Sequence, residues 1–253
     1  MAEHRFHTPE PVELELNVPV GDIDVQTVDG DESVVTITGS QKLLDQMRVE
    51  LEGQKLVVEL KGKHPFGIRI SIGDFNFGSE GLRIKATVPH ASGCAITTAT
   101  ADAKLRGRYA QVTTTSASGD LVVLGDIDGD ATIKTVSGDV RIAHVGGELR
   151  GSTVSGDVSA SAIDGSVALK SVSGDVRVDS VRQGSVTVQS VSGDIEVGIA
   201  PGTNLDVDAG SVSGDLTSEV PLGSEPGATH DGGPTLVVRG KTISGDFRVF
   251  RAA

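Results

Sequence analysis

The residues with the clearest chemical potential are seven aspartates, each the last residue of a Ser-Gly-Asp tripeptide. They are Asp120, Asp139, Asp157, Asp175, Asp194, Asp215 and Asp246. The intervals between them are 19, 18, 18, 19, 21 and 31 residues, which indicates an internal repeat. The tripeptide also suits a turn, because Gly adopts positive φ and the Ser and Asp side chains can bond nearby backbone groups.

Stacked at the spacing of neighbouring strands, these carboxylates would repel one another by about 1 kcal/mol per pair in water. The interpretation favoured here is that each carboxylate accepts hydrogen bonds from backbone N–H groups of its own turn, with help from the Ser hydroxyls. Two alternatives remain open, a row of bridging divalent cations and a linear ridge that binds a sugar or a partner. The cation alternative resembles calcium-binding nonapeptide repeats, but this chain lacks their Gly-Gly-x-Gly element.

The remaining reactive side chains form no catalytic pattern. The six histidines are scattered, at His4, His7, His64, His90, His144 and His230. The sequence contains no H-E-x-x-H, G-x-S-x-G, phosphate-loop or G-x-G-x-x-G motif. Hydrolases that use acid pairs on β-helices need long loops to wall a cleft, and most turns here span only a few residues. We therefore predict a protein that is not an enzyme, with no catalytic residue, cofactor or metal.

The elements that must position the aspartates follow from a nine-residue apolar period. One column contains Val140, Leu149, Val158, Val167, Val176, Val186 and Ile195. A second, two residues later, contains Ile142, Gly151, Ala160, Leu169, Val178, Val188 and Val197. A third, five residues after the first, contains Val145, Val154, Ile163, Val172, Val181 and Val191. Apolar residues two apart indicate strands, so each nonapeptide predicts a short strand and a turn.

Two nonapeptides, about 18 residues, return the chain to its starting point and make one coil. Successive coils then stack as parallel strands about 4.8 Å apart, with the three columns inside. The predicted fold is an all-β, right-handed parallel β-solenoid over residues 92–253, with a loop insertion at 219–234. The 33 glycines and the 3% of aromatic residues agree with tight corners and a thin aliphatic core.

The N-terminal third alternates apolar and polar residues less regularly. We predict a flexible terminus at 1–10 and an irregular β region at 11–91, with a short helical turn at 41–47. The β region would lead into the solenoid and cap its first coil, since an open end of a repeat stack exposes unpaired strand edges.

Charge and composition restrict the partners and the compartment. The net charge is −13 with no basic cluster in the sequence, which disfavours nucleic acid and anionic membrane surfaces. No apolar run reaches the roughly 18–20 residues of a membrane span, and residues 1–7 lack the apolar segment of a signal peptide. The single Cys94 lies on the core column and suits a reducing cytosol. A cytoplasmic location is therefore predicted.

The few aromatic residues are candidate partner contacts. Phe66, Phe75 and Phe77 lie in the loop 61–81, and Phe247 and Phe250 lie in the last coil, 242–251. Because that coil ends the chain without a polar cap, end-to-end self-association through it is predicted. A protein partner is the other expectation, and no small-molecule ligand is identified.

Three segments carry a resemblance to a known family. They are Thr135-Val136-Ser137-Gly138-Asp139-Val140, Val18-Pro19-Val20-Gly21-Asp22-Ile23 and Lys85-Ala86-Thr87-Val88-Pro89. They resemble a bacterial family of β-strand-repeat proteins of unassigned function, often labelled "putative adhesin". The resemblance covers nearly the whole chain and implies a right-handed parallel β-solenoid, with no functional residues to transfer.

The sequence thus predicts a structural or interaction protein, a rigid solenoid scaffold. An exported adhesin or carbohydrate-binding module that uses the Asp/Ser turn ridge is the alternative.

Overall fold

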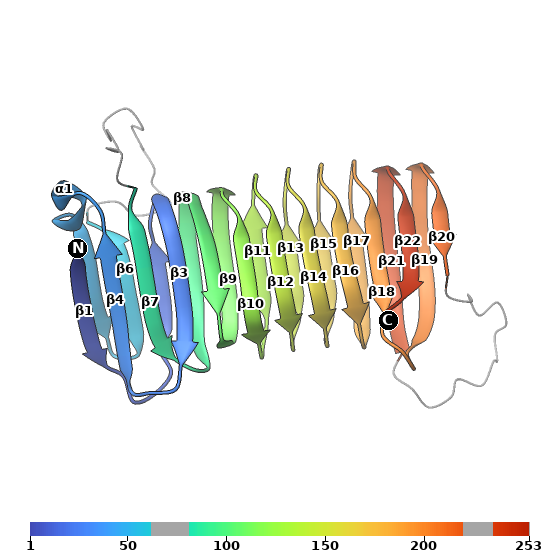
Figure 1. Ribbon diagram of the computed structural model, residues 1–253. Helices are drawn as coiled ribbons and strands as arrows, with labels where there is room; N and C mark the ends of the chain where they lie inside the picture. The colour runs from blue at the N-terminus through green and yellow to red at the C-terminus, as the bar shows by residue number, and fades with distance from the viewer. Residues whose placement is uncertain (62–80, 220–234, 253) are drawn as a thin grey trace.

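The computed structural model describes residues 1–61, 81–219 and 235–252. Within them, all strands join one sheet, and the helix α1 (Gln41–Leu44) lies within the predicted helical turn. Figure 1 shows the strands in a long row, with the N-terminus and α1 at one end. The sheet winds into stacked coils, so the predicted parallel β-solenoid is confirmed.

The strands fall into three groups along the chain. The N-terminal group contains β1 (Ala2–His7), β2 (Glu13–Asn17), β3 (Val20–Val28), β4 (Glu32–Thr38), β5 (Met47–Glu52), β6 (Lys55–Leu60) and β7 (Arg83–Pro89). The central group contains β8 (Ser92–Arg106), β9 (Arg108–Ser118), β10 (Leu121–Ile127), β11 (Ala131–Thr135), β12 (Val140–Val145), β13 (Leu149–Ser152), β14 (Val158–Ile163), β15 (Val167–Lys170), β16 (Val176–Val181), β17 (Gly184–Gln189) and β18 (Ile195–Ile199). The C-terminal group contains β19 (Asn204–Ser213), β20 (Leu216–Ser218), β21 (Thr235–Ser244) and β22 (Phe247–Arg251).

The central coils keep a strict parallel register. Strand β12 pairs with β14 and β14 with β16, while β13 pairs with β15 and β15 with β17. Val140, Val158, Val176 and Ile195 therefore stack in one buried ladder. The first predicted core column is confirmed, and the second is buried at every non-glycine position.

The third predicted column is only half correct. Val145, Ile163 and Val181 are buried, but Val154, Val172 and Val191 point to solvent with exposed fractions of 46%, 47% and 46%. The two turns of each coil differ. At the Ser-Gly-Asp turn a Thr or Ser points inward, so strand alternation turns the next valine outward.

The N-terminal strands continue the stack. Strands β2 and β3 pair in parallel with successive parts of β8, and β6 and β7 pair in parallel with β2 and β3. Strands β4 and β5 then pair antiparallel with β7 and β6, and β1 pairs antiparallel with β4. One hydrophobic core runs through these coils and across residue 91 without a break.

At the C-terminal end the coils do not stack in chain order. Strands β21 and β22 pair with β17 and β18, and β19 and β20 pair with the outer edges of β21 and β22. The last coil in sequence is thus second to last in space, as Figure 1 shows. Strands β19 and β20 cover the coil 242–251. The prediction that this coil forms an exposed end for self-association is therefore wrong.

Candidate interaction surface

The Ser-Gly-Asp turn is built by three residues with separate tasks. The buried Thr135 hydroxyl donates a hydrogen bond to the Ser137 carbonyl, with 3.0 Å between the oxygens. Gly138 has a φ of +114°, and a Cβ there would lie 2.3 Å from the Gly119 carbonyl oxygen of the preceding coil. Glycine is therefore required both by its conformation and by the close stacking of the turns.

The aspartates form a ladder between coils. The Asp139 N–H donates to Asp120 Oδ1 at 2.9 Å, and the Asp157 N–H donates to Asp139 Oδ1 at 3.1 Å. The same bond, from the N–H of each aspartate to the carboxylate of its neighbour, continues through Asp175, Asp194, Asp246 and Asp215. The prediction of bonds within each turn is wrong in detail, because the donor belongs to the adjacent coil.

Sequence reasoning missed the first member of this ladder. Asp102 accepts the Asp120 N–H at 2.9 Å, although no Ser-Gly precedes it. Its position 18 residues before Asp120 was the available signal. The carboxylates from Asp102 to Asp246 in this ladder each accept one charge-assisted hydrogen bond, which offsets the repulsion between neighbours. Among the described residues, no group of three or more His, Cys, Asp or Glu side chains is arranged to hold a metal ion.

Beside the Asp ladder lies a line of exposed aliphatic side chains, here called the aliphatic ridge. In spatial order it contains Val136, Val154, Val172, Val191, Ile243 and Val212, with exposed fractions of 52%, 46%, 47%, 46%, 54% and 82%. The serines that follow the first five of them pair between coils through four successive bridges, which places the aliphatic residues at coil spacing. Such a row of exposed apolar side chains is typical of a contact surface.

The predicted aromatic contacts divide into three outcomes. Phe66, Phe75 and Phe77 lie outside the described residues. Phe247 is fully buried, between Ile195 and Leu216 in register, so its assignment as a surface contact was wrong. Phe250 is half-buried, with the guanidinium carbons of Arg177 and Arg248 at 5.6 and 5.8 Å from its ring centre.

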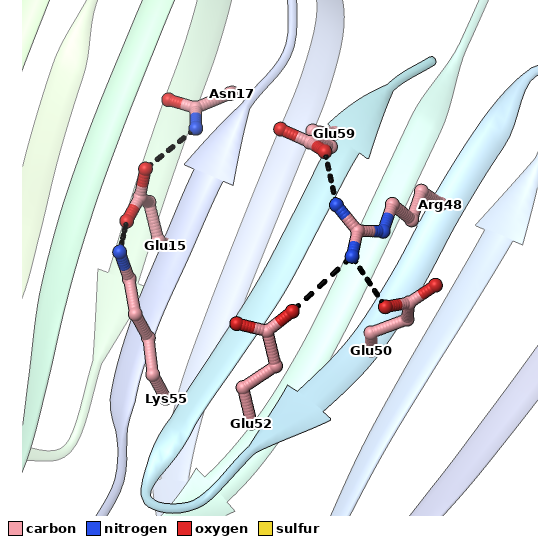
Figure 2. Close-up of polar contacts among 7 residues, drawn as sticks. All are labelled: Glu15, Asn17, Arg48, Glu50, Glu52, Lys55 and Glu59. Carbon is pink, nitrogen blue, oxygen red and sulfur yellow. Dashed lines mark hydrogen bonds and ion pairs between the residues drawn. The ribbon is translucent and has the colours of Figure 1, made fainter.

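A polar cluster on β5 and β6 is a network of ion pairs (Figure 2). Arg48 lies 2.5 Å from Glu50, 3.2 Å from Glu52 and 3.1 Å from Glu59. The hydrogen bond with Glu50, followed by the one with Glu59, raises the pKa of Arg48 above its ordinary value. Beside them Glu15 binds Lys55 at 2.5 Å, as Figure 2 shows. These carboxylates already have cationic partners, and exposed pairs of this kind stabilise a fold little.

One histidine has a defined polar environment. His144 Nδ1 lies 3.2 Å from Asp126 and Nε2 lies 3.1 Å from Asp164, which belong to the coils on either side. Because both ring nitrogens face carboxylates, neither is directed at an open site as a general base. Sequence reasoning did not single out this triad.

The fold and its surface define a class, the parallel β-solenoid repeat proteins with a repetitive exposed face. Within that class the chain belongs to the Toastrack family (DUF4097), whose model matches residues 12–250. This family has no assigned molecular function, and it matches the resemblance drawn from the sequence.

Solved structures show the same fold. A "putative adhesin" from Parabacteroides distasonis is 14% identical with a TM-score of 0.58, covering 98% of this chain and 96% of that one. A "putative lipid binding protein" from the same organism is 13% identical with a TM-score of 0.59 and the same coverage. A "putative adhesin" from Bacteroides fragilis is 16% identical with a TM-score of 0.50, again at 98% and 96%. A search of curated proteins found no match.

The described helix is too short to cross a membrane, and no other helix occurs in the described residues.

Proposed function

We propose that this protein is a non-catalytic scaffold that binds a protein partner along the aliphatic ridge. The observation that carries the proposal is the exposure of an aliphatic residue at the same point of six stacked coils. A rigid solenoid holds these side chains in a row before binding, so a partner that binds them loses little affinity to the cost of ordering them.

Folding alone does not account for the valines. The Thr or Ser before each one points inward, the Gly permits the turn, and the Asp links the coils. The valine points outward and fills no part of the core. A threonine would serve the extended backbone equally well, because β-branched residues of either polarity favour strands.

Two further considerations support a binding role over catalysis. The ladder carboxylates are engaged in hydrogen bonds between coils, and the described turns are too short to wall a cleft. The names of the structural neighbours, "putative adhesin", belong to those proteins and agree with a contact role.

Position-specific cross-linking tests the proposal. A photoreactive amino acid is placed at Val154 or Val172 on the ridge, and at the exposed Ser161 of β14 as the control, in the native host. We expect one discrete cross-linked partner from both ridge positions and none from Ser161. Replacing Val136 and Val191 by Thr should weaken that cross-link without changing the melting temperature. Cross-links of equal yield from all three positions would refute a ridge-specific partner.

The cytoplasmic location predicted from the sequence is part of the same proposal. Cell fractionation with antibody detection tests it separately. Recovery of the chain at the cell surface would favour the exported adhesin or carbohydrate-binding module instead.

A further inference from the structure

A second column of side chains runs parallel to the aliphatic ridge. Strand register aligns Thr115, Lys134, Ser152, Lys170, Gln189, Lys241 and Gly210 in successive coils. The three lysines, here called the lysine column, therefore occur at every second coil. All three are exposed.

These lysines differ from most of the described arginines. The arginines beside Asp24, Asp128 and Glu148 are held in ion pairs. Lys134, Lys170 and Lys241 have no ion pair with any described residue. Their ammonium groups are available to an external anion.

The lysine column and the aliphatic ridge are neighbouring rows on one face of the solenoid. Lys134 precedes Val136 by two residues, Lys170 precedes Val172, and Lys241 precedes Ile243. Residues two apart point to the same side of an extended backbone, about 6–7 Å apart. A ligand along the solenoid axis would thus meet cations on one flank and aliphatic groups on the other.

The spacing selects the backbone conformation of such a ligand. Lysines two coils apart are separated by about 9.6 Å, twice the spacing of parallel strands. A polyproline II helix returns to the same face every three residues, after about 9.3 Å. A β-strand turns residue i+3 to the opposite face. An α-helix places i+7 at about 10.5 Å and drifts out of register by the third lysine.

We propose that the partner binds here through an acidic segment in polyproline II conformation. A Glu or Asp at every third position would meet Lys134, Lys170 and Lys241, and an aliphatic residue of each triplet would pack on the ridge. This inference rests on the proposed function and specifies the chemistry of the partner.

The Asp ladder argues against broader anionic partners. Asp139, Asp157 and Asp175 lie three residues beyond the ridge valines, on the side away from the lysines. A lipid surface or a nucleic acid wide enough to reach the lysines across the ridge would also meet these carboxylates, which repel phosphate. A single extended segment is narrow enough to contact the lysines and the ridge alone.

The binding test uses synthetic peptides and the full chain. Fluorescent peptides carry four repeats of Glu-Pro-Val or of Glu-Val-Pro, since the two orders place valine on opposite sides of the glutamate row. A third peptide has the same composition with contiguous glutamates. We expect fluorescence anisotropy at low salt to show tighter binding of one repeating peptide than of the contiguous one, with affinity falling as salt is added.

Matched variants locate the site. Lys134→Gln, Lys170→Gln and Lys241→Gln combined should weaken the repeating peptide about tenfold, as three exposed charge pairs imply. The control combines Lys42→Gln, Lys85→Gln and Lys104→Gln, three exposed lysines away from the ridge. It removes the same charge and should leave the affinity within about twofold.

Several outcomes overturn the inference. These are no binding of either repeating peptide at millimolar concentration, equal binding of the contiguous peptide, and equal loss in the control variant. Binding of phosphatidylserine vesicles through Lys134, Lys170 and Lys241 without peptide binding would assign the column to lipid instead. Ridge-specific cross-links that survive the triple lysine variant would retain the proposed function and reject only the acidic segment.

Discussion

Replacing Gly156 with alanine should break the stacking of the solenoid at one turn. Gly156 has a φ of +126°, and an added Cβ would lie 2.3 Å from the Gly138 carbonyl oxygen and 2.8 Å from its carbon. Both atoms belong to the backbone of the preceding coil, so no side-chain rotation relieves the contact. Relief requires the two coils to separate by about 1 Å, since ordinary carbon contacts begin near 3.5 Å.

The magnitude follows from comparison with Gly53 in the turn between β5 and β6. Gly53 has a φ of +62°, and its added Cβ would meet nothing within 4 Å. Gly53→Ala therefore costs only the left-handed conformation, about 1–2 kcal/mol, less about 0.4–1 kcal/mol from the stiffer unfolded chain.

Gly156→Ala has a comparable conformational cost and also disturbs two hydrogen bonds between coils. These join Ser155 N to the Val136 carbonyl at 2.8 Å and Asp157 N to Asp139 Oδ1 at 3.1 Å. At about 1 kcal/mol for each hydrogen bond, the total loss in the free energy of unfolding is about 3 kcal/mol.

Urea unfolding followed by circular dichroism measures the difference between the two variants. We expect the midpoint of Gly156→Ala to fall well below that of Gly53→Ala, with faster amide exchange in the coils on either side of Gly156. Equal midpoints would refute the argument that backbone contact between coils requires glycine in these turns.

Three further outcomes follow from the same geometry. Asp157→Ala should lower the free energy of unfolding by about 1 kcal/mol, because the Asp175 N–H loses its acceptor. Asp157→Asn keeps an acceptor oxygen and should lower it less, and urea unfolding measures both variants. Equal losses would contradict the ladder. Phe247→Ala should cost about 3–5 kcal/mol, since the ring is fully buried above Gly240, and a surface-like loss below about 0.5 kcal/mol would contradict that burial. Burial raises the pKa of the Cys94 thiol from 9.0 to about 12. The stabilisation from this shift is complete below pH 9 and is lost as the pH rises toward 12. At about pH 8.5, iodoacetamide should label Cys94 only in the unfolded chain, and rapid labelling of the folded chain would contradict it.

The parallel coils could be predicted because two local signals agree. Residues such as Val140 and Ile142 alternate with polar ones, and Ser-Gly-Asp marks a turn at nearly constant intervals. The third column misled because the nine-residue period treats both turns of a coil alike. Thr153 is close to valine in volume and is buried, while the more apolar Val154 is exposed. A prediction from hydrophobicity alone would bury Val154 and expose Thr153, the reverse of what the structure shows.

The order of the last two coils could not be obtained from periodicity. Val238 and Val207 are equally suited to stack beside Val186, and only the longer intervals of 21 and 31 residues hinted at an exchange. Burial supplies the physical reason. The coil with Phe247 contains more apolar surface, and it is buried between two neighbours, while the outer coil leaves Leu216 50% exposed. Placing the larger side chain inside buries more apolar area.

The repeated turn separates the residues that build the stack from those that face solvent. Thr135 is buried and bonds within its turn, Gly138 packs against the preceding coil, and Asp139 bonds to Asp120. The side chains of Lys134 and Val136 are instead exposed. Substitutions at the outward positions should therefore change binding while the free energy of unfolding stays nearly constant. This separation allows the ridge and lysine variants to test recognition without testing folding. A loss of partner contact in Val136→Thr at an unchanged melting temperature would then report on the surface itself.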